Sequence, residues 1–197
     1  LLIVFYSLKY IPISLFATLI MTSPFFLLIF AKIILKEKLN YISWVTILIG
    51  FCGVLIVLRP SLSNINIFIF LVFFAVLIIS FNFTIVSKYS HIATSYGFTF
   101  YQYLPITLFA YIFFIFDPLV PSLKEFILFS SAGVLMMISM WAWNKAYHIA
   151  GKYSSIISPF FFTQIIWGSL YGIIFFSEEL SSMSIMGVIT IVISGTI

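Results

Sequence analysis

The chain of 197 residues is 63% hydrophobic, 20% aromatic and 7% charged, with a mean hydropathy of +1.26. Soluble domains carry about 25% charged residues, so this composition excludes an ordinary soluble protein and predicts an integral membrane protein. The net charge of +4 comes from scattered lysines and one arginine rather than from a basic stripe, which argues against a nucleic-acid-binding protein.

The long apolar runs predict helices. They lack the alternation of apolar and polar residues that transmembrane strands require, and a helix satisfies its own backbone groups in lipid. Cys52 lies in one such run without a second cysteine, so we predict a small buried side chain and no disulfide. Leu1 and Ile197 both lie inside apolar runs, and we expect the chain to be a piece of a longer protein.

About 20 apolar residues suffice to cross a hydrocarbon core of about 30 Å. By this criterion we predict one partial helix and seven whole or nearly whole spans, joined by short loops. The partial helix covers 1–8, and the spans cover about 13–35, 41–58, 67–87, 97–116, 125–147 and 156–176, with a last one from Ser184. Breakers and polar residues mark the loops, at Pro12, Lys36–Lys38, Arg59–Pro60, Lys88, Asp117–Pro118 and Ser181–Ser182.

Basic residues in short loops predict the orientation, because cytoplasmic loops are enriched in them. One side holds Lys32, Lys36, Lys38, Lys88, Lys145 and Lys152, and the other holds Lys9, Arg59 and Lys124. We therefore expect the Lys36–Lys38 turn in the cytoplasm and the turn at Glu178 outside.

The span 156–176 combines a packing signal with a polar, aromatic face. Gly168 and Gly172 form a G-x-x-x-G pair, which lets a neighbouring helix approach closely. Gln164, Trp167 and Tyr171 recur at helical spacing and share a face. This face either contacts a solute or bonds to a neighbouring helix.

The two ends of the chain contain a weak internal repeat. An offset of 141 residues places Tyr6 on Tyr147, Glu37 on Glu178 and Leu39 on Leu180. Because the two glutamate turns are predicted on opposite membrane faces, the repeat would be inverted, as in many secondary transporters. Chance alignment of apolar sequence is the alternative.

The order and spacing of short motifs resemble the EamA-type transporters of the drug/metabolite transporter superfamily. In the first half these are Lys9-Tyr10-Ile11-Pro12, Ser23-Pro24-Phe25-Phe26, Glu37 thirteen positions after the proline, Trp44 and Gly50-x-x-Gly53-Val54. In the second half they are Pro159-Phe160, the run from Thr163 to Trp167, and Phe176-x-Glu178. One departure is Ile165, which stands where the first half has Pro24.

This resemblance implies an all-α integral membrane protein of ten helices, made of two inverted five-helix repeats with both termini in the cytoplasm. Residues 1–58 would be the end of the first repeat, helices three to five. Residues 67–197 would be the second repeat, helices six to ten. The implied activity is the movement of a small metabolite, such as an amino acid or a cofactor.

Polar groups at membrane depth are the candidate substrate contacts, since each is costly there unless it is paired or lines a cavity. The candidates are Gln164, Trp167, Tyr171, Trp141, Asn144, Asn82, Tyr101, Gln102 and Ser23. For each of them, hydrogen bonding between helices, interfacial anchoring or packing is the structural alternative. Four further residues are expected to shape turns: Pro24, Glu37, Pro159 and Glu178.

No catalytic or metal-binding constellation is predicted. His91 and His148 are expected in loops, with no cysteine or aspartate placed to act with either. We expect no enzyme activity, no metal and no cofactor. The spans also place no ionisable residue near a midplane, so the interior would suit an amphipathic solute with a flat ring.

The sequence therefore predicts a secondary transporter working by alternating access in a bacterial inner membrane. Its expected partners are a small-molecule substrate and the lipid bilayer, with a homodimer as a further arrangement and no nucleic acid. The rival from another class is a membrane module that uses the same helices only for packing or assembly. A membrane enzyme with its catalytic group in a missing segment is the third option.

Overall fold

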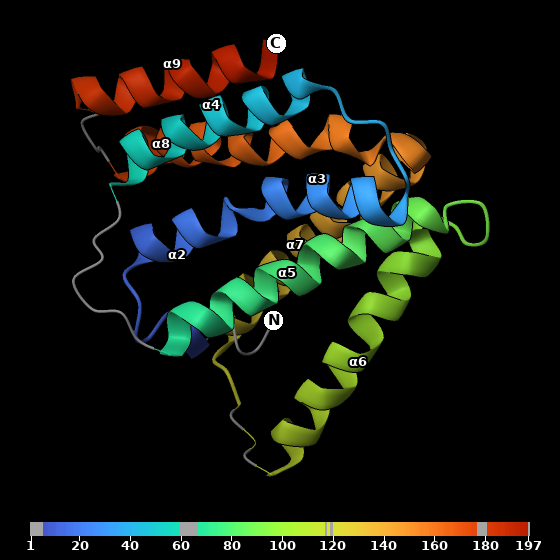
Figure 1. The fold of residues 1–197 in the computed structure, drawn as a ribbon. Coiled ribbons are helices and arrows are strands. Elements are labelled where there is room, and N and C mark those ends of the chain that lie inside the picture. Colours follow the sequence, from blue (N-terminus) through green and yellow to red (C-terminus); the bar gives the residue numbers. More distant parts are fainter. Residues whose placement is uncertain (1–5, 60–66, 117, 119, 177–180, 197) are drawn as a thin grey trace. The chain divides into compact units, whose positions relative to one another are not determined.

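The computed structural model describes residues 6–59, 67–116, 118, 120–176 and 181–196 (Figure 1). All regular structure in these ranges is helical, which confirms the predicted all-α class. The elements are α2 (Ile13–Ile20), α3 (Ser23–Ile34), α4 (Tyr41–Leu58), α5 (Ile67–Lys88), α6 (Ser95–Phe116), α7 (Leu123–Ala150), the 3-10 helix η1 (Gly151–Phe162), α8 (Thr163–Phe176) and α9 (Ser182–Thr196).

Five helical stretches of the described chain are long and apolar enough to cross a membrane. One of them runs 53 residues from Leu123 to Phe175 and contains α7, η1 and α8. Because about 20 residues make one crossing, this stretch is long enough for two. The apolar α9 is shorter. These lengths and compositions are those of an integral, multi-pass helical membrane protein.

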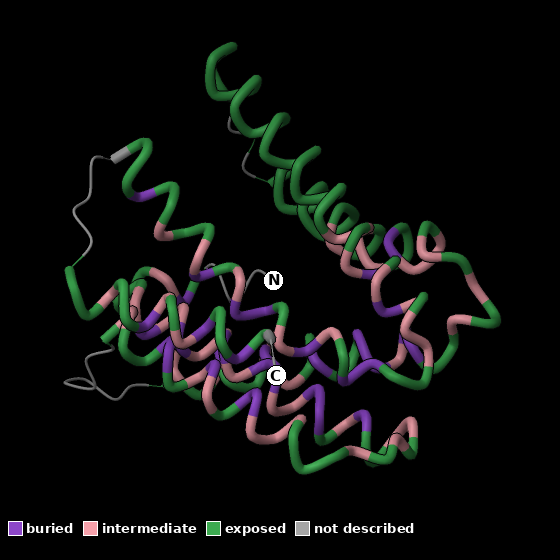
Figure 2. The backbone as a smooth tube through the Cα atoms, turned by 90° about the horizontal axis from the view of Figure 1, so that it is seen from above, coloured by how far each residue is buried: buried purple, intermediate pink, exposed green. Residues whose placement is uncertain are grey.

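The chain divides into two compact units, each described by itself. Unit 1 comprises 1–84 and 152–197, and unit 2 comprises 85–151. In unit 2, residues 123–139 of α7 are all exposed, as is most of α6 (Figure 2). The division into units differs from the predicted repeat boundaries, 1–58 and 67–197, which stay a prediction.

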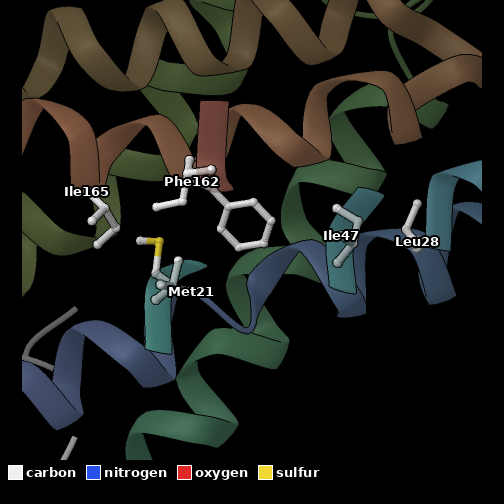
Figure 3. Close-up of a cluster of buried hydrophobic side chains, with 7 residues drawn as sticks. Met21, Leu28, Ile47, Phe162 and Ile165 are labelled. Atoms are coloured by element: carbon white, nitrogen blue, oxygen red, sulfur yellow. The ribbon is translucent and has the colours of Figure 1, made fainter. Parts of the chain in front are cut away.

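The core of unit 1 surrounds Phe162, whose side chain is fully buried. Figure 3 shows Met21 and Ile165 on one side of its ring and Ile47 and Leu28 on the other. These residues come from elements at both ends of the sequence. The core therefore joins the first helices of the chain to η1, α8 and α9.

Helices α4 and α9 lie side by side at glycines (Figure 1). A Cβ atom added to Gly53 would lie 2.8 Å from the Gly187 carbonyl oxygen. A Cβ atom added to Gly187 would likewise lie 2.8 Å from the Gly53 carbonyl oxygen. Gly50 lies against Ser194. Residue numbers thus rise along α4 as they fall along α9, so the two helices are antiparallel.

The G-x-x-x-G pair of α8 does not make the predicted close approach at Gly168. A Cβ atom at Gly168 would meet nothing within 4 Å among the described residues. Among the glycines of unit 1 whose surroundings are described, tight packing occurs between α4 and α9. Close approach depends on which face of a helix meets a neighbour, and the spacing of glycines does not specify that face.

The helical geometry changes at two positions 141 residues apart. α2 ends and α3 begins around Met21–Thr22, and η1 ends and α8 begins at Phe162–Thr163. The Thr22 hydroxyl donates to the Leu19 carbonyl at 2.6 Å, and the Thr163 hydroxyl donates to the Phe160 carbonyl at 2.7 Å. Thr22 and Thr163 are equivalent at this offset, and so are Leu19 and Phe160. This correspondence supports the predicted repeat.

Pro24 lies inside the membrane-length stretch Ile13–Ile34, which agrees with the predicted span 13–35. The helix breaks just before this proline, which lies in the first turn of α3. Proline is tolerated there because the amide that it lacks would have no helical partner anyway.

The predicted helix from Ile156 also begins differently. Residues 151–162 form a 3-10 helix with a kink at Tyr153 (φ −109°, ψ 41°), and the α-helix starts only at Thr163. Pro159 lies inside this 3-10 helix. Because Pro159 has no backbone N–H, it removes one bond from an α-helical ladder at this point.

Two further expectations are wrong. His148 lies in the last turn of α7 rather than in a loop, and its Nε2 is 3.0 Å from the Ala93 carbonyl oxygen, which accepts the bond. Cys52 is exposed rather than buried. An apolar run in a membrane protein does not indicate which of its residues face other helices, because lipid is as apolar as a core.

Candidate functional site

The first candidate site is a cavity of about 610 Å³ between α6 and α7, within unit 2. Its lining is almost entirely apolar and aromatic, and every lining residue is uncharged. These residues are Tyr96, Thr99, Phe100, Tyr103, Leu104, Thr107, Met137, Ile138 and Trp141. The volume lies in the range of about 300–1,000 Å³ that is typical of small-molecule sites.

Trp141 is the main aromatic wall of this cavity. Its ring stacks on Tyr96 with a centroid distance of 5.3 Å and an interplanar angle of 27°. The Lys145 ammonium lies 4.9 Å from the centroid of the Trp141 ring. The indole Nε1 is buried and has no hydrogen-bond partner within the described chain. Trp141 therefore offers a flat aromatic surface at the cavity wall.

A buried amide network adjoins the same cavity. Asn144 is fully buried, and its Nδ2 donates to the Gln102 Oε1 at 2.8 Å and to the Thr99 Oγ1 at 3.0 Å. The Gln102 Nε2 donates in return to the Asn144 Oδ1 at 3.4 Å. Because Thr99 also lines the cavity, this network reaches its wall.

The structure thus brings together three of the predicted contact residues: Trp141, Asn144 and Gln102. Tyr101 does not line the cavity and is 72% exposed. The neighbouring aromatics of α6 line it instead. Tyr96, Phe100 and Tyr103 recur at helical spacing, and this stripe in the sequence would have identified the lining face.

The second candidate site is a cavity of about 570 Å³ within unit 1, lined by α4, η1, α8 and α9. Its wall contains more polar surface, contributed by five hydroxyl side chains. These belong to Ser43, Thr46, Ser155, Thr163 and Ser194. Pro159, predicted to shape a turn, also lines this cavity.

Glu37 meets Ser155 at one end of this second cavity. The Ser155 backbone N–H donates to the Glu37 Oε2 at 3.3 Å, and the Ser155 hydroxyl donates to the Glu37 Oε1. The turn that holds Glu37 contains Lys36 in the left-handed region (φ 53°), and the Glu37 N–H donates to the Ala31 carbonyl at 3.2 Å. Glu178, the predicted counterpart, lies outside the described residues.

The remaining predicted contacts of unit 1 line neither cavity. Gln164, Trp167 and Tyr171 are exposed on α8, Trp167 by 58% and Tyr171 by 55%. Asn82 is exposed on α5. Ser23 is buried, and its hydroxyl donates to the Ile20 carbonyl at 2.6 Å.

No group of three or more His, Cys, Asp or Glu residues that could hold a metal ion occurs in the part of the chain that the structure describes. Asn144, Gln102 and Trp141 supply neutral donors and acceptors. Such a site can bind and orient a solute by stacking and hydrogen bonds.

Comparison with known proteins shows which class of protein this chain resembles. Residues 1–59 match the EamA-like transporter family, in agreement with the resemblance that the motifs indicated. The family is one of transporters rather than of enzymes.

Two relatives are transporters of the same name. The chain is 31% identical to a riboflavin transporter of Vibrio cholerae over 151 residues, which cover 76% of this chain and 50% of that protein. It is 40% identical to a riboflavin transporter of Brucella anthropi over 55 residues, covering 28% of this chain and 19% of that protein. The chain spans about half the length of the first relative.

Proposed function

We propose that the whole protein is a secondary transporter that carries a small metabolite with a flat ring, riboflavin or a close analogue, across a bacterial inner membrane. The observation that carries this proposal is the aromatic cavity between α6 and α7, with Trp141 stacked on Tyr96 at 5.3 Å. The family match and the names of the two bacterial relatives support it. The predicted homodimer stays a prediction.

The chemistry of the cavity suits a flavin. Riboflavin combines a planar tricyclic ring, whose edge carries carbonyl acceptors and an N–H donor, with a chain of hydroxyl groups. Tyr96, Phe100 and Trp141 offer faces for stacking on the flavin ring. Thr99 connects this wall to the amides of Asn144 and Gln102.

Alternating access is supported by features of unit 1. The break between α2 and α3 at Met21–Thr22 and the change from η1 to α8 at Phe162–Thr163 occupy equivalent positions of the predicted repeat. α4 runs antiparallel to α9, the helix at its equivalent position. Interrupted helices at matching positions of two inverted halves are the pattern of carriers with a site between the halves.

Uptake of labelled riboflavin into vesicles containing the full-length protein tests the proposal. We expect Trp141→Ala to raise the KM about tenfold, because it removes stacking worth about 1.4 kcal/mol. Trp141→Phe should recover much of the loss. Trp167→Ala is the matched control, since Trp167 lines neither cavity. Absence of flavin uptake by the parent protein, or an unchanged KM in Trp141→Ala, would contradict the proposal.

One observation favours the rival packing module: Asn144 is buried and finds its hydrogen-bond partners within the protein. Cysteine substitutions at Thr99 and Thr107 separate the two functions, because both residues line the cavity. A carrier exposes both positions to water-soluble thiol reagents, and riboflavin should slow their reaction. A packing module would leave both cysteines unreactive.

A further inference from the structure

The contact between Glu37 and Ser155 joins parts of the chain 118 residues apart. Both carboxylate oxygens are used, one for the backbone N–H and one for the hydroxyl of the same serine. Ser155 is only 8% exposed and Glu37 is half-buried, so water competes weakly for this charge-assisted contact. The contact ties the turn between α3 and α4 to the start of η1.

The segment that Glu37 holds has the features of a hinge. Gly151 has a positive φ of 51°, and Tyr153 leaves helical geometry two residues before Ser155. η1 covers 12 residues from Gly151 to Phe162, as 3-10 segments on both sides of the Tyr153 kink, whereas 3-10 runs longer than three or four residues are uncommon. A long 3-10 segment inside a membrane-spanning stretch often marks a place where the helix rearranges.

Two hydroxyls of η1 point to a second arrangement of this segment. The Ser154 and Ser158 side chains are fully buried, and their Oγ atoms have no hydrogen-bond partner among the described residues. Buried polar groups are costly when unpaired. An arrangement in which η1 moves and these hydroxyls meet water or a partner would relieve that cost.

The contact also lies at a cavity wall. Ser155 lines the 570 Å³ cavity together with Ser43 on α4 and Thr163 on α8. Moving η1 away from Glu37 would therefore move one wall of this cavity. The direction of opening is toward the turn that holds Glu37.

We propose that Glu37 is a positioning residue of the transport cycle. Its hydrogen bonds to Ser155 keep η1 closed over the hydroxyl-lined cavity. When these bonds break, the cavity opens to the side of the Lys36–Lys38 turn. This inference rests on the proposed transport function. The carboxylate itself touches η1 rather than the solute. The contact would form and break once in each cycle.

Accessibility of a cysteine in the cavity tests the contact without any substrate. In the full-length protein with Cys52→Ser, Thr163→Cys reports on the cavity wall through its rate of reaction with a small water-soluble maleimide. We expect Glu37→Gln and Ser155→Ala each to raise this rate severalfold. Glu37→Asp should raise it too, because the shorter side chain keeps its charge but loses reach.

Glu125→Gln is the matched control. At the start of α7, the Glu125 carboxylate accepts hydrogen bonds from the same two groups of a serine. These are the Ser122 backbone N–H at 2.9 Å and the Ser122 hydroxyl at 2.7 Å. It lines neither cavity, so its substitution should leave the rate unchanged. Unchanged rates in Glu37→Gln, Glu37→Asp and Ser155→Ala, in protein that elutes as a single folded species, would overturn the inference.

A reversible cross-link tests the cycle. Glu37→Cys with Ser155→Cys, joined by a short bifunctional thiosulfonate, should abolish riboflavin uptake, and a reducing agent should restore it. Full uptake by the cross-linked protein would show that the contact does not open and would overturn the inference. Absence of uptake in the parent protein refutes the proposed function instead, and the accessibility rates then decide on the contact.

Discussion

At the scale of single residues, Asn144 is the most constrained polar group of unit 2. It is fully buried and bonded to two residues of α6, Thr99 and Gln102. Hydrogen bonds between membrane helices are worth about 0.6 kcal/mol on average and up to about 1.7 kcal/mol. The network therefore contributes little free energy of stabilisation. Its main effect is to fix which faces of α6 and α7 meet.

Asn144→Ala should lower the free energy of unfolding by about 1–2 kcal/mol, because it leaves Thr99 and Gln102 without their shared partner. Unfolding in detergent, followed by tryptophan fluorescence, measures the change. Thr107→Val is the matched control, since the Thr107 hydroxyl donates only to Tyr103 of its own helix at 3.0 Å. A smaller loss in Asn144→Ala than in the control would contradict the network's role.

At the scale of elements, close packing in unit 1 depends on glycines where α4 crosses α9. The atoms that a Cβ at Gly53 or Gly187 would meet include the backbone carbonyl oxygen of the other glycine, which cannot move aside as a side chain can. Without a hydrophobic drive in lipid, such close contact is a main source of helix association. The exposed Gly168 on α8 has no comparable neighbour within the described chain.

Gly53→Val should destabilise the protein by about 1–3 kcal/mol, the usual cost of overpacking a close contact. Gly168→Val should cost much less, because its Cβ meets nothing within 4 Å in the described part of the chain. Thermal unfolding of the two variants in the same detergent makes the comparison. Equal losses of stability in the two variants would contradict this prediction, because they would show that Gly168 is packed as tightly as Gly53.

At the scale of the whole molecule, two contacts agree with the predicted sides of the membrane. Glu37 meets Ser155, so the Lys36–Lys38 turn and Lys152 lie at one end of unit 1. Arg59 meets Ser181 at 3.2 Å at the other end of the 18-residue α4. Lys36, Lys38 and Lys152, assigned to one side, thus lie apart from Arg59, assigned to the other, as the predicted orientation requires.

Labelling of single cysteines in intact cells tests this orientation. In the full-length protein with Cys52→Ser, Ser181→Cys should react with a membrane-impermeant maleimide. Lys38→Cys should react only after the cells are permeabilised, since its turn carries the lysines expected inside. The reverse pattern would invert the orientation, and labelling of both from outside would contradict α4 as a membrane span.

The sequence by itself determined the helical class, the approximate spans and the resemblance to EamA-type transporters. Apolar length and charged loops decide these features, and both can be read along the chain. It also identified Trp141, Gln102 and Asn144 as candidate contacts, together with Gln164 and Trp167. All five residues are candidates for the same reason: each carries a polar group that is predicted to lie within the membrane.

Only the tertiary structure decided which polar residues meet. Asn144 bonds to Gln102, and Glu37 bonds to Ser155. Trp167 is 58% exposed on α8, whereas Trp141 lines a cavity. The reason is that lipid is as apolar as a protein interior, so hydrophobic periodicity does not reveal which face of a membrane helix meets another helix. That face is set by rotation and close packing of helices distant in the sequence.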